Sequence, residues 1–85
     1  MTTPAPRPLH KIADEITRKW PEPFYGARPY IRAMRYLATM EDNYHEDKAD
    51  EIVLRFLTNA RGWRGEDAKR IKAELRSMLP KRRTR

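Results

Sequence analysis

The apolar residues between positions 47 and 80 constrain the fold more than any other feature of the chain. They recur every three or four residues, which is the period of one face of an α-helix. The pattern is interrupted near Gly62, so the segment predicts two amphipathic helices joined by a tight turn. We expect the first to start near Asp47, as its N-cap, and to stop at Gly62. The second should run from about Glu66 to Leu79.

Two further helices are predicted ahead of this segment. Leu9, Ile12 and Ile16 share one face of a helix over residues 9–19, which the prolines at positions 21 and 23 must end. Another helix should run from Pro29 to about Met40, with Ile31, Met34, Leu37 and Ala38 on its inner face.

Loops are expected over residues 21–28 and 41–46. Phe24 and Tyr25 lie in the first of these loops, where Gly26 permits a turn. We expect the two aromatic rings to fold back over the core.

Eighty-five residues form one domain, and no segment shows strand-like alternation. The fold class that we predict is all-α, a compact bundle of four short helices with disordered basic termini. Its parts are a flexible proline-rich arm at 1–8, a single helical domain at 9–79 and a basic tail at 80–85. The expected core residues are Ile12, Ile16, Trp20, Ile31, Met34, Leu37, Ile52, Val53, Phe56, Leu57, Ala60, Trp63, Ile71, Leu75 and Met78.

Charge is spread unevenly along the chain, whose net charge is +7. Residues 41–54 carry six acidic side chains and one basic one, whereas residues 55–85 carry eleven basic and three acidic ones. Basic segments of this kind favour polyanions such as nucleic acid. The alternative is that the acidic block neutralises a basic segment, within the fold or in a second copy, as in a homodimer that sets residues 41–51 against a basic end.

The basic side chains form two stripes at helical spacing. One consists of Lys69, Lys72 and Arg76 and is extended by the basic tail, and the other consists of Arg28, Arg32 and Arg35. Such stripes suit contacts with phosphates, although the solvated face of any amphipathic helix is also polar. Arg70 should be less available, because Glu66 and Glu74 each lie four residues away. The residues predicted to bind nucleic acid are Arg28, Arg32, Arg35, Arg64, Lys69, Lys72, Arg76, Lys81, Arg82 and Arg83.

A second hypothesis is a protein-interaction module. Exposed tyrosines among arginines also suit protein interfaces. The interface residues would be Tyr30, Tyr36, Tyr44 and Trp63, although Trp63 is also a core candidate.

Other chemistries have little support in the sequence. The single serine, Ser77, has neither of the two histidines near it in sequence, so we expect no catalysis. The acidic segment 41–50 lacks the central glycine of a calcium loop, and we expect no metal or cofactor. A helix-turn-helix around Gly62 is a weak match, because Glu66 and Asp67 would face phosphates.

The order and spacing of certain residues resemble small uncharacterised proteins of actinobacterial phages and mobile elements. That family has no assigned activity, so the resemblance implies a setting, in which a partner would be phage nucleic acid or a host protein. It implies no functional residue. The resembling residues span about 12–79 and are Trp20, Pro29, Tyr30, Ala33, Met34, Phe56, Leu57, Asn59, Ala60, Trp63, Arg64, Gly65, Ala68, Ile71, Lys72, Glu74 and Leu75.

Taken together, the sequence predicts a non-enzymatic basic protein that binds DNA or RNA through phosphate contacts. The alternative is a phage-type module that binds and modulates a host protein. No apolar run approaches the roughly 20 residues of a membrane span, and the N-terminus lacks a signal-peptide pattern. We therefore expect a cytoplasmic protein without membrane association, in the host cell cytoplasm if it is phage-encoded.

Overall fold

The structure is a computed structural model that describes residues 7–79 of the chain. Within that range it is mainly helical, as predicted, with one small two-stranded sheet in addition. The disordered ends that the sequence predicts fall largely on residues 1–6 and 80–85, outside the described residues. The elements are α1 (Leu9–Lys19), the 3-10 helix η1 (Tyr25–Ala27), α2 (Arg28–Met34), β1 (Asn43–Tyr44), β2 (Asp47–Lys48), α3 (Ala49–Asn59) and α4 (Glu66–Met78).

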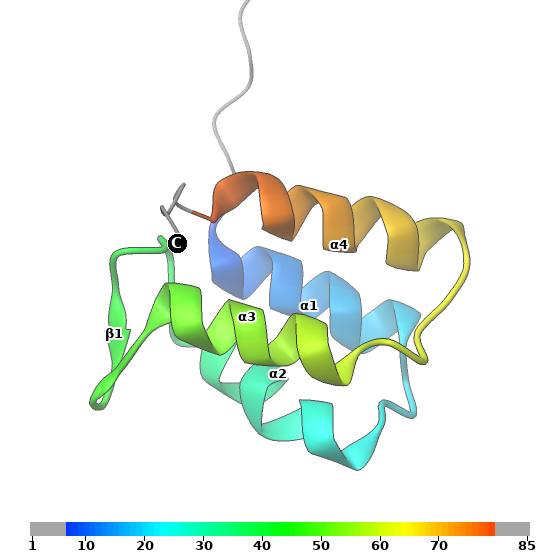
Figure 1. Cartoon of the computed structure of the whole chain (residues 1–85), viewed down its shortest axis with the longest axis horizontal. Helices are drawn as coiled ribbons and strands as arrows, with labels where there is room; N and C mark the ends of the chain where they lie inside the picture. Colours follow the sequence, from blue (N-terminus) through cyan, green and yellow to red (C-terminus); the bar gives the residue numbers. More distant parts are fainter. Residues whose placement is uncertain (1–6, 80–85) are drawn as a thin grey trace, which may run out of the picture.

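The helices surround a single apolar core. Helix α1 packs against both α2 and α4, and α3 packs against α2 (Figure 1). Each helix turns one apolar face inward, because its apolar residues repeat with the helical period. The buried helical side chains of the core are Leu9, Ile12, Ala13 and Ile16 from α1, Ile31, Ala33 and Met34 from α2, Ala49, Ile52, Val53 and Phe56 from α3, and Ala68, Ile71 and Leu75 from α4.

Helix α2 ends at Met34, well before the predicted end near Met40. The chain instead leaves the helix and passes the start of α1. There the carbonyl oxygens of residues 37 and 38 accept hydrogen bonds from the backbone N–H groups of His10 (2.9 Å) and Leu9 (3.0 Å). These N–H groups have no partner inside α1, and Pro8 at its N-cap provides no side-chain cap. The segment after α2 therefore caps α1, and Ala38 is exposed instead of facing the core.

Residues 43–48 form a β-hairpin, which corrects the prediction of a loop over residues 41–46. A two-residue hairpin turn favours left-handed backbone conformations, and His45 adopts a φ of 57° at its first position. The antiparallel register pairs Asn43 with Lys48 and Tyr44 with Asp47.

The hairpin also shifts the start of α3. Because β2 contains Asp47, the helix begins at Ala49 and its N-cap is Lys48, so the predicted cap at Asp47 is wrong. The helix ends at Asn59, before the predicted stop at Gly62.

The predicted core is largely confirmed, with two kinds of exception. Trp20, Leu57 and Met78 are only partly buried at the edge of the core. Phe24 and Tyr25 do not fold back over it, since their side chains are 49% and 77% exposed.

None of the helices in residues 7–79 combines the length and the apolar character that crossing a membrane requires.

Candidate functional site

A stacked pair of tryptophans holds the segment between α3 and α4. The Trp63 side chain is only 5% exposed. Its ring lies parallel to the ring of Trp20, with 5.2 Å between the centroids and 4° between the planes. Trp20 also meets the ring of Phe56 edge-on, at 6.4 Å. Because Trp63 is anchored in the core, its neighbours Arg61 and Arg64 are presented at the surface, where both are exposed.

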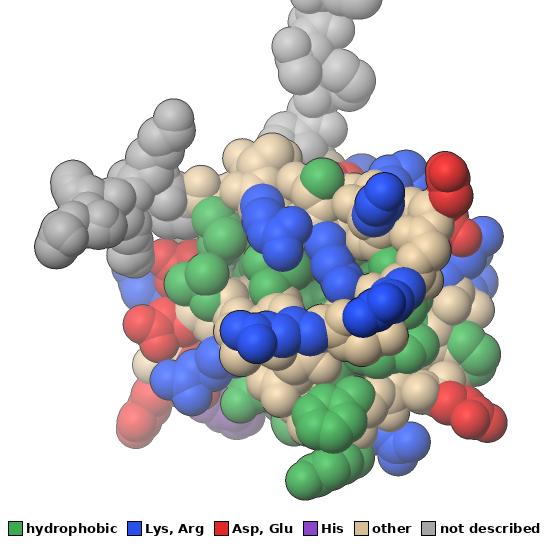
Figure 2. All heavy atoms as spheres, turned by 45° about the vertical axis from the view of Figure 1, so that its right-hand side comes forward, with side chains coloured by type: hydrophobic (Ala, Val, Ile, Leu, Met, Phe, Trp, Pro, Cys, Tyr) green, Lys and Arg blue, Asp and Glu red, His purple; other side chains and the backbone are tan. Residues whose placement is uncertain are grey.

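The side chains around this segment form an open hollow of about 380 Å³, which we call the basic groove. Five cationic side chains line it and no carboxylate does. Within residues 7–79, none of the five forms an ion pair with an acidic side chain. Figure 2 shows Lys and Arg side chains gathered on this face, with acidic side chains toward its edges. The lining residues are Arg61, Trp63, Arg64, Gly65, Lys69, Lys72 and Arg76.

Lys72 is the most constrained of these cations. Its Nζ donates a 2.7 Å hydrogen bond to the backbone carbonyl oxygen of Trp63. Burial lowers the pKa of Lys72, and the positive charges of Arg76 and Arg64 lower it further. A bound anion would favour the charged ammonium and offset both effects. The groove is therefore a place where negative charge from a ligand is stabilising.

The other long face of α4 is electrically neutralised against α1. Arg70 contacts Glu15 of α1 at 2.7 Å and Asp67 of its own helix at 2.9 Å. The prediction that Arg70 pairs with Glu66 and Glu74 is therefore wrong, because the packing of α4 on α1 brings Glu15 within reach. Helix α4 thus carries one ion-paired face and one face of unpaired cations.

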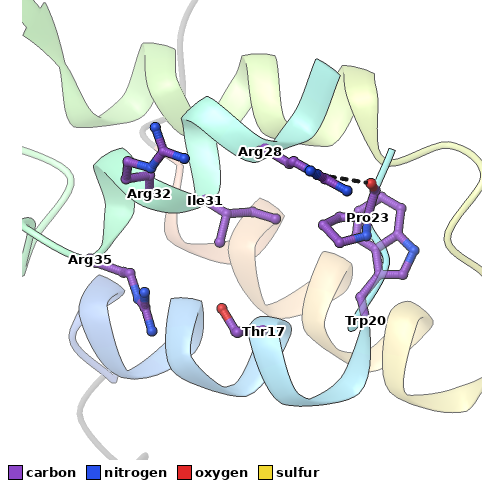
Figure 3. A pocket seen from close by; sticks show the side chains of 7 residues that line it. All are labelled: Thr17, Trp20, Pro23, Arg28, Ile31, Arg32 and Arg35. Carbon is purple, nitrogen blue, oxygen red and sulfur yellow. Dashed lines mark hydrogen bonds between the residues drawn. The ribbon is translucent and has the colours of Figure 1, made fainter. Parts of the chain in front are cut away.

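The three arginines of the α2 region line a separate, smaller hollow of about 170 Å³ (Figure 3). Its other walls are Thr17, Trp20, Pro23 and Ile31, so this hollow is largely apolar beneath the cations. Arg28 Nε donates a long hydrogen bond of 3.4 Å to the carbonyl oxygen of Pro23. Arg35 lies 3.6 Å from the carboxylate of Asp14. No residue lines both this hollow and the basic groove within the described chain, so the two predicted stripes form two sites.

The four aromatic residues predicted for a protein interface do not share one surface. Trp63 lies in the core, and Tyr30 is partly buried against it. Tyr36 is 73% exposed and stacks on Tyr44, with 5.8 Å between ring centroids. The ring of Tyr44 in turn contacts His45, at 4.4 Å. Of these four residues, only Tyr36 is exposed, and it stacks on the partly buried Tyr44 at the hairpin end of the molecule.

The basic groove contains one cationic residue that the sequence prediction left out. Arg61 is not among the residues predicted to bind nucleic acid, but it lines the groove with Arg64. The two arginines flank the buried Trp63, and that spacing is a signal the sequence did contain. Lys81, Arg82 and Arg83 were predicted to extend this site and lie outside the described residues.

The hydroxyl of Ser77, the single serine of the chain, is hydrogen-bonded to its own helix. Ser77 Oγ donates a 2.7 Å hydrogen bond to the carbonyl oxygen of Glu74, one turn earlier on α4. Neither Ser77 nor a histidine lines the basic groove. Its side chains are suited to holding an anion.

Comparisons of the chain with models of protein families, with curated proteins and with solved structures gave no match. The resemblance to phage and mobile-element proteins therefore stays a prediction.

Proposed function

We propose that the protein is a non-enzymatic nucleic-acid-binding protein that holds the phosphate backbone in the basic groove. One observation carries the proposal. Five cationic side chains converge on a hollow that no carboxylate lines, whereas other cations, such as Arg7 and Arg70, are ion-paired. Unpaired cations around a concave surface attract polyanions and release the counterions of the ligand on binding.

The test is a titration of the protein with labelled single-stranded and duplex oligonucleotides at several salt concentrations. The variant R64Q/K69Q removes two groove cations that are exposed and make no ion pair within residues 7–79. The matched control K11Q/R18Q removes two exposed cations of α1 that do not line the groove. Both variants have the same net charge.

We expect R64Q/K69Q to bind more weakly and to show a shallower dependence of log K on log salt. The slope should decrease by about 1 to 2, at roughly 0.7–0.9 for each phosphate that the protein no longer neutralises. The control should keep a slope close to that of the wild type. Equal losses of affinity in both variants would mean that net charge, and not the groove, governs binding. Removing residues 80–85 should weaken binding further, since four of them are Lys or Arg.

A second candidate function, protein interaction, is favoured by the exposed Tyr36 ring, which stacks on the partly buried Tyr44 of the acidic hairpin. A partner would be a host protein with a basic, aromatic-accepting surface. Affinity capture with wild type, Y36A and R64Q/K69Q distinguishes the two candidates. Under this hypothesis, Y36A loses the partner, and R64Q/K69Q and the chain without residues 80–85 retain it.

A further inference from the structure

A third hollow, of about 240 Å³, adjoins the basic groove. Arg61 lines both, so the two hollows meet at its side chain. The other residues around this third hollow are Phe24, Thr58, Asn59 and Gly62, and none of them is charged. A ligand that follows the groove past Arg61 therefore reaches an uncharged surface with an aromatic ring in its wall.

The aromatic rings at this place are exposed and contribute nothing to the apolar core. Phe24 and Tyr25 lie with 4.8 Å between their ring centroids and 56° between their planes. The side chain of Tyr25 is 77% exposed, the highest value among the large hydrophobic side chains that the structure describes. A small domain has few large apolar side chains with which to build its core, so two exposed rings side by side indicate a contact surface.

Local structure positions the Phe24 ring and the helical turn that carries Tyr25. Helix η1 packs against α3, next to the end of that helix. A Cβ atom at Gly26 would lie 2.6 Å from the Phe24 ring and 2.7 Å from the Asn59 side-chain oxygen. The Phe24 ring therefore lies directly over the backbone of Gly26, and a Cβ there would displace the ring or the Asn59 side chain. The amide nitrogen of Asn59 donates a 2.8 Å hydrogen bond to the carbonyl oxygen of Arg55, which fixes its side chain.

We propose that Phe24 and Tyr25 stack on unpaired bases, so that the ligand of the basic groove is a single-stranded nucleic acid. This inference rests on the proposed function. Duplexes keep their base faces inside the helical stack, whereas single strands offer them to aromatic side chains. The combination of a cationic groove with adjoining exposed rings is the arrangement that single-strand binding requires. Arg61 stands between the two parts and can contact a phosphate or stack on a base.

The direct test places a fluorescent reporter at the stacking position. Tyr25→Trp adds an indole there, and Tyr36→Trp adds one at the exposed position next to the hairpin as a control. Each variant is titrated with an oligo-dT strand of about 12 nucleotides, within the site sizes of single-strand binders. We expect quenching of the added indole in Tyr25→Trp and none beyond the wild-type signal in Tyr36→Trp. Equal signals in the two variants would overturn the inference.

The affinity test replaces each aromatic ring with the smaller apolar side chain of leucine. Tyr25→Leu should weaken binding of the single strand by about 5- to 100-fold, the usual effect of losing one stacked base. Binding of the matching duplex should change by less than about twofold. Tyr36→Leu is the control. The affinity of Phe24→Leu is interpreted only if the thermal unfolding of this variant matches that of the wild type. Tyr25→Leu is expected to fold because the Tyr25 side chain is so exposed.

The stacking inference and the groove proposal fail in different ways. If R64Q/K69Q weakens binding but Tyr25→Leu does not, the stacking inference is wrong and the groove proposal stands. If the duplex binds as tightly as the single strand and neither depends on Tyr25, the ligand is not single-stranded. If the wild type binds neither at low salt, both proposals fail, and the ring pair becomes a candidate protein contact.

Discussion

The carboxylate of Glu15 is the centre of the ion pairs that join α1 to α4, and its removal should destabilise the fold. Its side chain is only 12% exposed, and it contacts Arg70 at 2.7 Å and Arg7 at 2.9 Å. Hydrogen bonding to Arg70 is the main cause that lowers the pKa of Glu15 to about 2, from an ordinary value of 4.5; burial opposes the change and Arg7 adds to it. Glu15→Gln keeps the shape and removes the charge.

The expected loss can be worked out from that pKa. A decrease from 4.5 to about 2 corresponds to about 3 kcal/mol, at about 1.4 kcal/mol per pKa unit. Arg7 and Arg70 are 38% and 50% exposed, so water and salt screen part of this interaction. We therefore expect E15Q to lower the free energy of unfolding by about 1–2 kcal/mol at neutral pH. For a domain of this size, that lowers Tm by about 5–15 °C.

The pH dependence gives the sharper assay. In the unfolded chain the pKa of Glu15 is near 4.5, and in the folded chain it is about 2. The stabilisation is therefore fully present above about pH 5 and is lost as the pH falls toward 2. Urea unfolding of wild type and E15Q, followed by far-UV circular dichroism, should show a difference at neutral pH that shrinks in acid. Glu22→Gln, at an exposed loop residue with no ion pair in residues 7–79, is the control. A difference that stays constant from neutral pH to about pH 2 would show that the charge of Glu15 is not its source.

Two other predictions concern the segment that presents the basic groove. Gly65→Ala should lower the free energy of unfolding by about 1–3 kcal/mol, because Gly65 has a φ of 111° and a ψ of 179°, a region that other residues avoid. Gly62→Ala should change the free energy of unfolding by less than about 0.5 kcal/mol, since φ is not positive there and nothing lies within 4 Å of an added Cβ. Chemical denaturation compares the two variants, and equal effects would show that the backbone conformation of Gly65 is not the cause. Trp20→Ala should lower the free energy of unfolding by about 3 kcal/mol, because it removes the stack on Trp63. The near-UV circular dichroism signal should decrease as well, and an unchanged near-UV spectrum would show that the rings are not stacked.

Local pattern was enough to place most of the helices. The predicted bounds of the first helix are those of α1, and the last helix differs from α4 by one residue. The apolar faces were also predictable, because side-chain direction in a helix follows directly from sequence spacing. The hairpin was not predictable in this way. Two-residue strands are too short to show an alternation, and their turn, with His45 at its first position, lacks the Asn-Gly or Asp-Gly pair that signals a hairpin.

The candidate site was predictable only in part. Lys69, Lys72 and Arg76 form a stripe through helical spacing alone, and the structure confirms that they line one hollow. The sequence could not show that Arg28, Arg32 and Arg35 belong to a different hollow. It also led to the wrong expectation for Phe24 and Tyr25, since large aromatic side chains are usually buried in a small domain.

The helical class, the helix faces and the excess of positive charge follow from the order of residues alone, because each depends on residues a few positions apart or on composition. Tertiary packing decided which cations are free. Glu15 neutralises Arg70 from a distance of 55 residues along the chain, while Trp63, stacked on Trp20, holds Arg61 and Arg64 beside α4. The end of α2 was decided in the same way, by the N–H groups of α1 that needed acceptors. Such pairings depend on distances in space, and spacing along the chain does not contain them.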